Sequence, residues 1–148
     1  FHLPVALAYI LTRQQLSEEA RNELVNLGVF FQIQDDYLDY FGDPVVTGKV
    51  GTDIEEGKLS WLALTFLENA GEEQVATFKR HYGKMNTEYI DAIRKLYANS
   101  DLAERYKQCH EESLARHEAA IANLESLQQP MAAAILRSFG AKIFHRNR

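Results

Sequence analysis

The chain has 148 residues, 25% of them charged and 46% hydrophobic, and a formal net charge of -5. The length allows one domain with a substantial core, and the acidic balance argues against a nucleic-acid binder. No apolar run approaches the roughly 20 residues that a membrane span requires. The single cysteine, Cys109, excludes an internal disulfide and fits a reducing compartment, so we expect a cytoplasmic protein.

Apolar residues recur at helical spacing along the chain, and no segment alternates with period two, so we predict an all-α protein. The first predicted helix, at 3–11, is apolar on all sides, which is typical of a helix buried in a larger bundle. The chain starts at Phe1, without a methionine and inside this pattern, so we expect a piece of a longer protein. Ser17 is a suitable N-cap for a second helix of about 24 residues that reaches Phe41.

A polar, glycine-rich connection at 42–57 follows the second helix. Beyond it we predict five further helices: one at 59–67, one that starts at Gly71 and stops at Gly83, one capped by Asn86, a long one capped by Ser100, and a last one opened by Pro130. The long helix carries a continuous inward stripe, made of Leu102, Tyr106, Cys109, Ser113, His117, Ile121 and Leu124.

Three carboxylates fall within five residues near the end of the second predicted helix: Asp35, Asp36 and Asp39. In a helix Asp35 and Asp39 are one turn apart, about 6 Å along the axis, and share a face. Like charges at this spacing repel, and a helix C-terminus disfavours negative charge. Mg2+ binds through one or two carboxylates together with substrate phosphates, so a metal ion would relieve the repulsion. An exposed acidic turn is the alternative, because acidic residues are common on solvated faces.

Two lysines and a further aspartate lie in or directly after the connection: Lys49, Asp53 and Lys58. Ammonium groups can neutralise phosphate oxygens while carboxylates hold a metal ion. The connection is not a phosphate-binding P-loop, because its glycine–lysine spacings are one residue too long and neither lysine precedes Ser or Thr. A solvated loop is the alternative interpretation of these three residues.

Residues 30–62, FFQIQDDYLDYFGDPVVTGKVGTDIEEGKLSWL, closely resemble the second aspartate-rich region of farnesyl diphosphate synthases of the eukaryotic type. The similarity extends more loosely to residues 1–8 and 142–148. The resemblance implies an incomplete helical bundle of the isoprenoid synthase type, with residues 1–148 as the C-terminal half of that domain. The family's first aspartate-rich motif and upstream basic residues are not in this chain, so we expect the 148 residues alone to have no turnover.

The resemblance also implies a reaction. Such enzymes join an allylic diphosphate, dimethylallyl or geranyl, to isopentenyl diphosphate with the help of Mg2+, and farnesyl diphosphate is the product. Loss of diphosphate leaves an allylic carbocation, which the isopentenyl double bond attacks before a proton is lost. A homodimer is expected from the family. Two alternatives remain open: a geranylgeranyl or longer-chain synthase, and a truncated helical subunit that binds partners without catalysis.

The resemblance assigns metal roles by position. Asp35 would be the direct Mg2+ ligand, with Asp36 and Asp39 supporting it. Asp53 would hold water bound to the metal.

Substrate roles are implied in the same way. Lys49 and Lys58 would contact the allylic diphosphate, and Lys49 with Asp35 would be the catalytic residues. Phe31 would lie beside the isopentenyl chain and Gln32 near the substrates. A basic tail that closes over the site would supply the last two contacts, Arg146 and Arg148.

Overall fold

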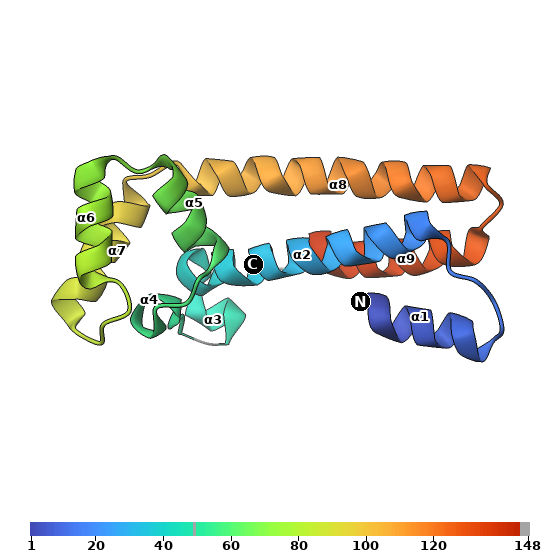
Figure 1. Ribbon diagram of the computed structural model, residues 1–148, viewed down its shortest axis with the longest axis horizontal. Helices are drawn as coiled ribbons and strands as arrows, with labels where there is room; N and C mark the ends of the chain where they lie inside the picture. Colours follow the sequence, from blue (N-terminus) through green and yellow to red (C-terminus); the bar gives the residue numbers. More distant parts are fainter. Residues whose placement is uncertain (49, 146–148) are drawn as a thin grey trace. The chain divides into compact units, whose positions relative to one another are not determined.

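The computed structural model describes residues 1–48 and 50–145 (Figure 1). These residues form helices and no strand, which confirms the all-α prediction. They fold as two compact units, each considered by itself below. The first unit comprises Phe1–Gln32 and the described residues from Gln108 onward; the second comprises the described residues of Ile33–Lys107. Among all described residues, none of the helices combines the length and apolar character that a membrane crossing needs.

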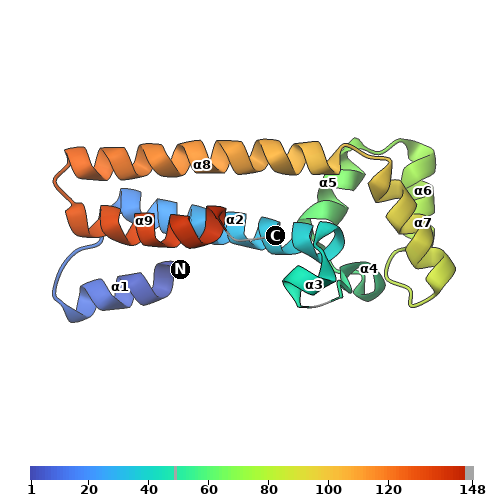
Figure 2. The same cartoon turned by 180° about the vertical axis from the view of Figure 1, so that it is seen from behind.

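Four helices contribute to the first unit: α1 (His2–Leu11), the N-terminal part of α2 (Glu18–Phe41), the C-terminal part of α8 (Leu102–Ser126), and α9 (Pro130–Phe144). Figure 2 shows α9 from the other side, next to the start of α2. The hydroxyl of Ser17 accepts a long hydrogen bond of 3.4 Å from the backbone N–H of Ala20. The predicted N-cap is therefore present, and α2 has the predicted bounds and its predicted 24 residues.

Aromatic stacking and aliphatic burial hold the first unit together. The rings of Phe30 and Phe144 stack with their centroids 5.1 Å apart, which joins α2 to α9. Leu27 on α2, Leu124 on α8 and Leu136 on α9 are almost completely buried, and full burial of such a side chain contributes about 1.5–3 kcal/mol. The stripe predicted on α8 is buried throughout except at Cys109, which is half-buried.

One ionisable pair lies inside this core. Nδ1 of His117 is 2.8 Å from Oε1 of Glu23, and both side chains are buried. Arg116 adds a second basic group 3.6 Å from the other oxygen of Glu23. Because an unpaired carboxylate is costly to bury, these contacts allow Glu23 to occupy the middle of a helix interface.

Helix α1 is only partly buried within this chain. Val5 and Tyr9 are its two buried residues. Its other large apolar side chains are exposed: Leu3, Leu7, Ile10 and Leu11. Burial on all sides was predicted for a larger bundle, which these residues do not test, so it stays a prediction.

The second unit contains the last two turns of α2, the start of α8, and five helices between them: α3 (Pro44–Thr47), α4 (Asp53–Glu56), α5 (Trp61–Asn69), α6 (Glu72–His81) and α7 (Thr87–Ala98). The connection predicted as a loop thus contains two single-turn helices. Asn86 caps α7 as predicted, by accepting a hydrogen bond of 2.9 Å from the N–H of Glu88. Ser100 does not cap α8; its hydroxyl instead donates to the carbonyl of Tyr97 at 2.6 Å.

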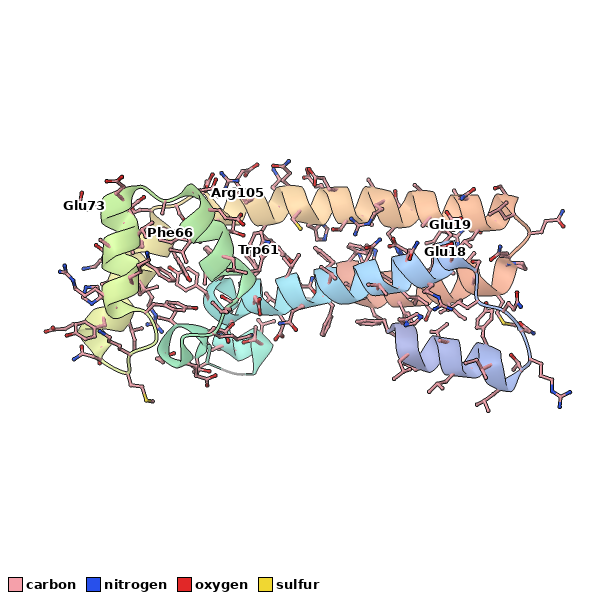
Figure 3. All side chains as sticks on the ribbon, viewed as in Figure 1. Glu18, Glu19, Trp61, Phe66, Glu73 and Arg105 are labelled. Atoms are coloured by element: carbon pink, nitrogen blue, oxygen red, sulfur yellow. The ribbon has the colours of Figure 1, made fainter. Side chains whose placement is uncertain are left out.

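Aromatic rings also form the centre of the second unit. Phe66 of α5, labelled in Figure 3, stacks on Phe78 of α6 with a centroid separation of 5.6 Å. Phe78 in turn stacks on Tyr82 at 4.3 Å, while Ile93 and Leu102 are fully buried beside them. This packing fixes the turn after α6 next to the loop that precedes α5.

We expect replacement by alanine to change stability in opposite directions at two helical glycines of the first unit. A Cβ at Gly140 would overlap the imidazole of His117, including a separation of 2.8 Å from Cδ2. A Cβ at Gly28 would meet only Phe1, at an ordinary 3.7 Å. We expect Gly140→Ala to lower the free energy of unfolding by about 1–3 kcal/mol through overpacking, and Gly28→Ala to raise it by about 0.5–1 kcal/mol.

Urea denaturation of both variants checks this pair. Gly28→Ala is the matched control, since it makes the same chemical change in a helix with open space. Equal stabilisation by both substitutions would contradict the close contact between α8 and α9.

Candidate functional site

Asp36 is the most deeply buried carboxylate of the second unit and joins three segments. Its Oδ1 accepts a hydrogen bond of 2.9 Å from the ammonium of Lys58, and its Oδ2 accepts one of 2.7 Å from the backbone N–H of Trp61. The side chain is only 6% exposed. Asp36 therefore ties the end of α2 both to the loop before α5 and to the first residue of α5.

Lys58 bridges two carboxylates from different parts of the chain. Besides Asp36, its ammonium contacts both oxygens of Asp53, at 3.0 and 3.3 Å. The lysine side chain is 40% exposed, whereas that of Asp53 is 14% exposed. The side chain of Lys58 is thus more exposed than either of the carboxylates that it contacts.

Asp39 organises the backbone of the same region. Its Oδ2 accepts a hydrogen bond of 3.0 Å from the N–H of Asp53, and its Oδ1 accepts one of 3.4 Å from the N–H of Thr52. Both donors lie at the N-terminus of α4, where a negative charge is favourable. A Cβ at Gly51 would lie 2.6 Å from Oδ2 of Asp39, so the backbone of Gly51 packs closely against this side chain. We call Asp36, Asp39, Asp53 and Lys58 the carboxylate–lysine cluster.

The charges of this cluster affect one another. Burial alone would lower the pKa of Lys58, but hydrogen bonds to Asp36 and Asp53 outweigh it and raise the pKa well above its ordinary 10.5. Burial raises the pKa of Asp53 above its ordinary value, and the nearby Asp39 and Asp36 carboxylates add to the rise while Lys58 opposes it. The cluster is therefore rich in negative charge, and Lys58 only partly compensates for it.

The turn after α6 supports the loop that carries Lys58. The hydroxyl of Tyr82 donates a hydrogen bond of 2.7 Å to the carbonyl of Lys58. The N–H of Gly83 donates one of 3.0 Å to the carbonyl of Ile54. Neither contact could be predicted from sequence, because the partners are far apart along the chain and form no motif.

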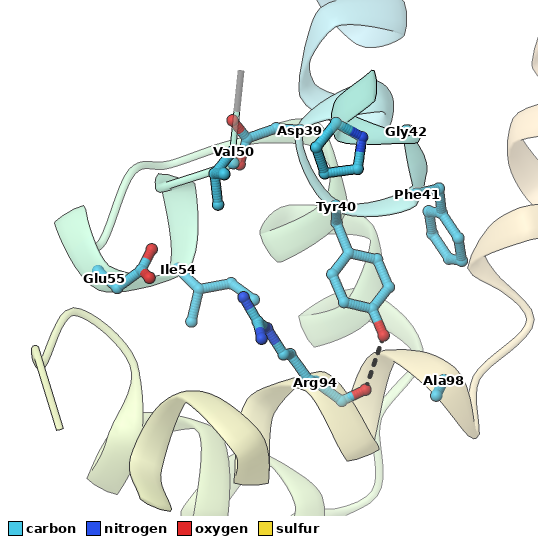
Figure 4. A pocket seen from close by; sticks show the side chains of 11 residues that line it. Asp39, Tyr40, Phe41, Gly42, Val50, Ile54, Glu55, Arg94 and Ala98 are labelled. Atoms are coloured by element: carbon cyan, nitrogen blue, oxygen red, sulfur yellow. Dashed lines mark hydrogen bonds between the residues drawn. The ribbon is translucent and has the colours of Figure 1, made fainter. Parts of the chain in front are cut away.

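A cavity of about 580 Å³ lies beside the cluster (Figure 4). Asp39 lines it together with Tyr40, Val50, Ile54 and Arg94. The hydroxyl of Tyr40 donates to the carbonyl of Arg94 at 2.9 Å, which joins α2 to α7 along one wall of the cavity. Of the four residues in the carboxylate–lysine cluster, Asp39 lines this cavity, whereas Lys58 does not.

The structure brings together some of the predicted site residues. Asp36, Asp53 and Lys58 are in direct contact, and Asp39 contacts the backbone of Asp53. Asp35 lies one residue before Asp36 on α2 with a half-buried side chain.

Other predicted residues lie elsewhere. Half-buried Phe31 and exposed Gln32 belong to the first unit, where the ring of Phe31 packs edge-on against Phe1. Three predicted residues, Lys49, Arg146 and Arg148, are outside the residues that the structure describes.

The predicted metal ligands do not form a cage of their own. In residues 1–48 and 50–145, no group of three or more histidine, cysteine, aspartate or glutamate side chains is arranged to hold a metal ion. Asp36 and Asp39 already accept hydrogen bonds from protein donors. The donor set nevertheless suits a hard cation such as Mg2+, which prefers oxygen and usually takes only one or two carboxylates from a protein.

The fold is all-α, and the second unit contains a partly buried carboxylate–lysine cluster. Residues 1–100 match the sequence model of the family described as "Polyprenyl synthetase", and the chain belongs to this family. It is 38% identical over its full length to farnesyl pyrophosphate synthase 1 of Cannabis sativa and to human farnesyl pyrophosphate synthase, of which it covers 43% and 35%. The chain thus spans less than half the length of these curated relatives.

Solved structures agree with this assignment. The farnesyl diphosphate synthase of T. brucei in complex with bisphosphonate BPH-1326 superposes with a TM-score of 0.89 and 34% identity, over 99% of this chain and 50% of the other. The complex of the T. brucei enzyme with risedronate gives a TM-score of 0.81 at 37% identity, over 86% of this chain and 36% of the other. The predicted resemblance to farnesyl diphosphate synthases is therefore confirmed.

The two acceptor roles of Asp36 predict a stability effect. In Asp36→Asn the side chain keeps only one acceptor oxygen, so it can accept from Lys58 or from Trp61 but not from both. The new NH2 group then faces the donor that has lost its acceptor. We expect the free energy of unfolding to fall by about 1–3 kcal/mol in urea denaturation. Asp91→Asn, which changes an exposed carboxylate on α7, is the control and should stay within about 0.5 kcal/mol. Equal effects would show that the contacts of Asp36 do not stabilise the unit.

The raised pKa of Lys58 predicts how its contribution depends on pH. Because the folded-state pKa lies above 10.5, the lysine stabilises the fold fully below pH 10.5 and loses this effect as pH rises toward the folded-state value. The difference in unfolding free energy between the wild type and Lys58→Met should stay constant from about pH 7 to about pH 9.5 and shrink above it. A difference that grows at alkaline pH would contradict the ion pair.

Proposed function

We propose that this chain is the C-terminal half of the helical domain of a prenyltransferase of the farnesyl diphosphate synthase type. The reaction would be the Mg2+-dependent condensation of dimethylallyl or geranyl diphosphate with isopentenyl diphosphate to farnesyl diphosphate. In it the allylic carbon–oxygen bond breaks, a carbon–carbon bond forms to the isopentenyl double bond, and a proton is lost. The identity to farnesyl pyrophosphate synthases over the whole chain supports this proposal.

One observation carries the proposal at the level of the site. The ammonium of Lys58 is held at hydrogen-bond distance by two carboxylates, and the lysine side chain is much more exposed than either of them. A diphosphate that approaches from the accessible side meets the positive charge first. Lys58 can then stabilise the negative charge that develops on the diphosphate as it leaves the allylic carbon.

Asp35 and the carboxylates of the cluster divide between two tasks in this proposal. Asp36 and Asp39 hold the loop and the N-terminus of α4 in place through their protein donors. Asp35 would be the direct ligand of Mg2+, with diphosphate oxygens and water completing its coordination, and Asp53 would hold one of these waters. When bound, Mg2+ would supply charge that stabilises the departing diphosphate.

Five further residues would contact the substrates. Lys49, Arg146 and Arg148 would add positive charge around the diphosphate groups, with Lys49 acting beside Asp35 as a catalytic residue. Phe31 and Gln32 would contact the isopentenyl chain and the substrates.

The assembly and cellular context are likewise proposed. The active form would need the remaining half of the enzyme, would pair as a homodimer, and would work in the cytoplasm without a nucleic-acid partner. A longer product, such as geranylgeranyl diphosphate, is the alternative within the same reaction class.

The exposed apolar side chains of α1 favour a second candidate function. Leu3, Leu7, Ile10 and Leu11 form a surface that suits contact with another helix. A non-catalytic helical subunit would use such a surface to bind a partner. The mass of the source protein separates the two functions, because this chain covers only 43% and 35% of the two farnesyl pyrophosphate synthases compared above.

We expect the 148-residue chain alone to show no turnover, and the same chain joined to the upstream half of a relative to form farnesyl diphosphate in the presence of Mg2+. In the joined protein Asp35→Ala should lower kcat by at least about 100-fold, because it removes a direct metal ligand. The measurement is product formation from radiolabelled isopentenyl diphosphate.

Asp91→Ala, an exposed carboxylate on α7, serves as the control and should retain full activity. Full activity of Asp35→Ala would contradict the metal role, and a longer prenyl product would select the alternative synthase.

A further inference from the structure

The proposed function leaves one group of contacts without a role: those between the turn at Tyr82–Gly83 and the loop at 54–58. Tyr82 donates to the carbonyl of Lys58 at 2.7 Å, and Gly83 donates to the carbonyl of Ile54 at 3.0 Å. The loop is therefore fixed at both of its ends by two consecutive residues of a distant turn.

The two segments also touch between these bonds. Gly57 and Gly83 both have positive φ, 64° and 75°, in the left-handed region that favours glycine. A Cβ on Gly57 would lie 2.9 Å from the Cα of Gly83, and a Cβ on Gly83 would lie 3.2 Å from the Cα of Gly57. The backbones are thus in direct contact, which leaves the loop little room to shift toward the turn.

The hydroxyl of Tyr82 is itself held in place. Its ring stacks on Phe78 with a centroid separation of 4.3 Å and an interplanar angle of 20°, and Phe78 is buried in the core. A tyrosine has two side-chain torsions, so stacking of the ring largely determines where the hydroxyl lies. The carbonyl of Lys58 therefore has a fixed donor that is connected directly to the core of the second unit.

A lysine side chain is long and flexible, and its ammonium can be placed accurately only if both ends are restrained. Asp36 and Asp53 restrain the ammonium of Lys58, and Tyr82 restrains its backbone. When a diphosphate replaces one of the carboxylate contacts, the restraint on the backbone remains. The origin of the side chain then stays fixed while the ammonium is released.

We propose that Tyr82 is a positioning residue for Lys58, which orients the lysine toward the diphosphate of the substrate through the hydrogen bond to its carbonyl. The inference rests on the proposed function, because it assumes that Lys58 meets a diphosphate. In this role Tyr82 would act through Lys58 and would not contact the substrate.

The chain offers a close control for this inference. Tyr40 also donates its hydroxyl to a distant backbone carbonyl, that of Arg94, at 2.9 Å, and it lies in the same unit. Tyr40→Phe and Tyr82→Phe therefore remove the same kind of bond and preserve the ring. A purely structural role of Tyr82 predicts that the two variants behave alike.

The test uses the full-length enzyme that contains this chain, with its activity and its binding of Mg2+ plus inorganic diphosphate measured separately. For Tyr82→Phe we expect KM for the allylic diphosphate and the calorimetric Kd for diphosphate to rise about five- to tenfold, with kcat within about threefold. Tyr40→Phe should leave both constants within about twofold. Both variants should lower Tm by similar amounts.

Equal KM and Kd values for Tyr82→Phe and the wild type would overturn the inference while the proposed function stands. Equal rises in Tyr82→Phe and Tyr40→Phe would also overturn it, since a general loss of stability then explains them. Failure of the wild type to bind diphosphate with Mg2+ would overturn the proposed function itself, and the inference with it.

Discussion

The second unit depends on the ammonium of Lys58 lying between Asp36 and Asp53. Two carboxylates that are mostly removed from water repel each other and are costly to bury without a cation. One lysine satisfies both, and this requires residues 53–58 to return to the last turns of α2. The short helix α4, the entry into α5 and the close approach of Gly51 to Asp39 all follow from that return.

The same contacts would also preorganise the proposed site. Asp36 and Asp39 accept bonds from backbone N–H groups, so their positions are set by the fold before any ion arrives. Preorganised groups do not need to reorient when charge develops, which is the main electrostatic advantage of a protein site over water. In the proposed function the cluster would therefore serve folding and binding with the same atoms, and substitutions in it would affect both.

Much of the fold could be predicted because its signals are local. The bounds of α2 follow from Ser17 and a regular apolar face, and the cap of α7 follows from Asn86. The helices α3 and α4 were missed because each is only four residues long, too short for a periodic pattern. The aspartates and lysines of the site were recognisable from their spacing and from a family resemblance. The role of Asp36 in beginning α5, and the support from Tyr82, depend on contacts across more than 20 residues, which no local pattern records.

Trp61 is the only tryptophan of the chain, and its backbone N–H is bonded directly to Asp36. Its indole also lies edge-on to Tyr106, with ring centroids 6.2 Å apart. Indole emission responds to nearby charge and solvent, so a change in the partners of Asp36 alters the surroundings of this one fluorophore. The fluorescence of Trp61 therefore responds to changes in the carboxylate–lysine cluster, and no added label is needed to follow them.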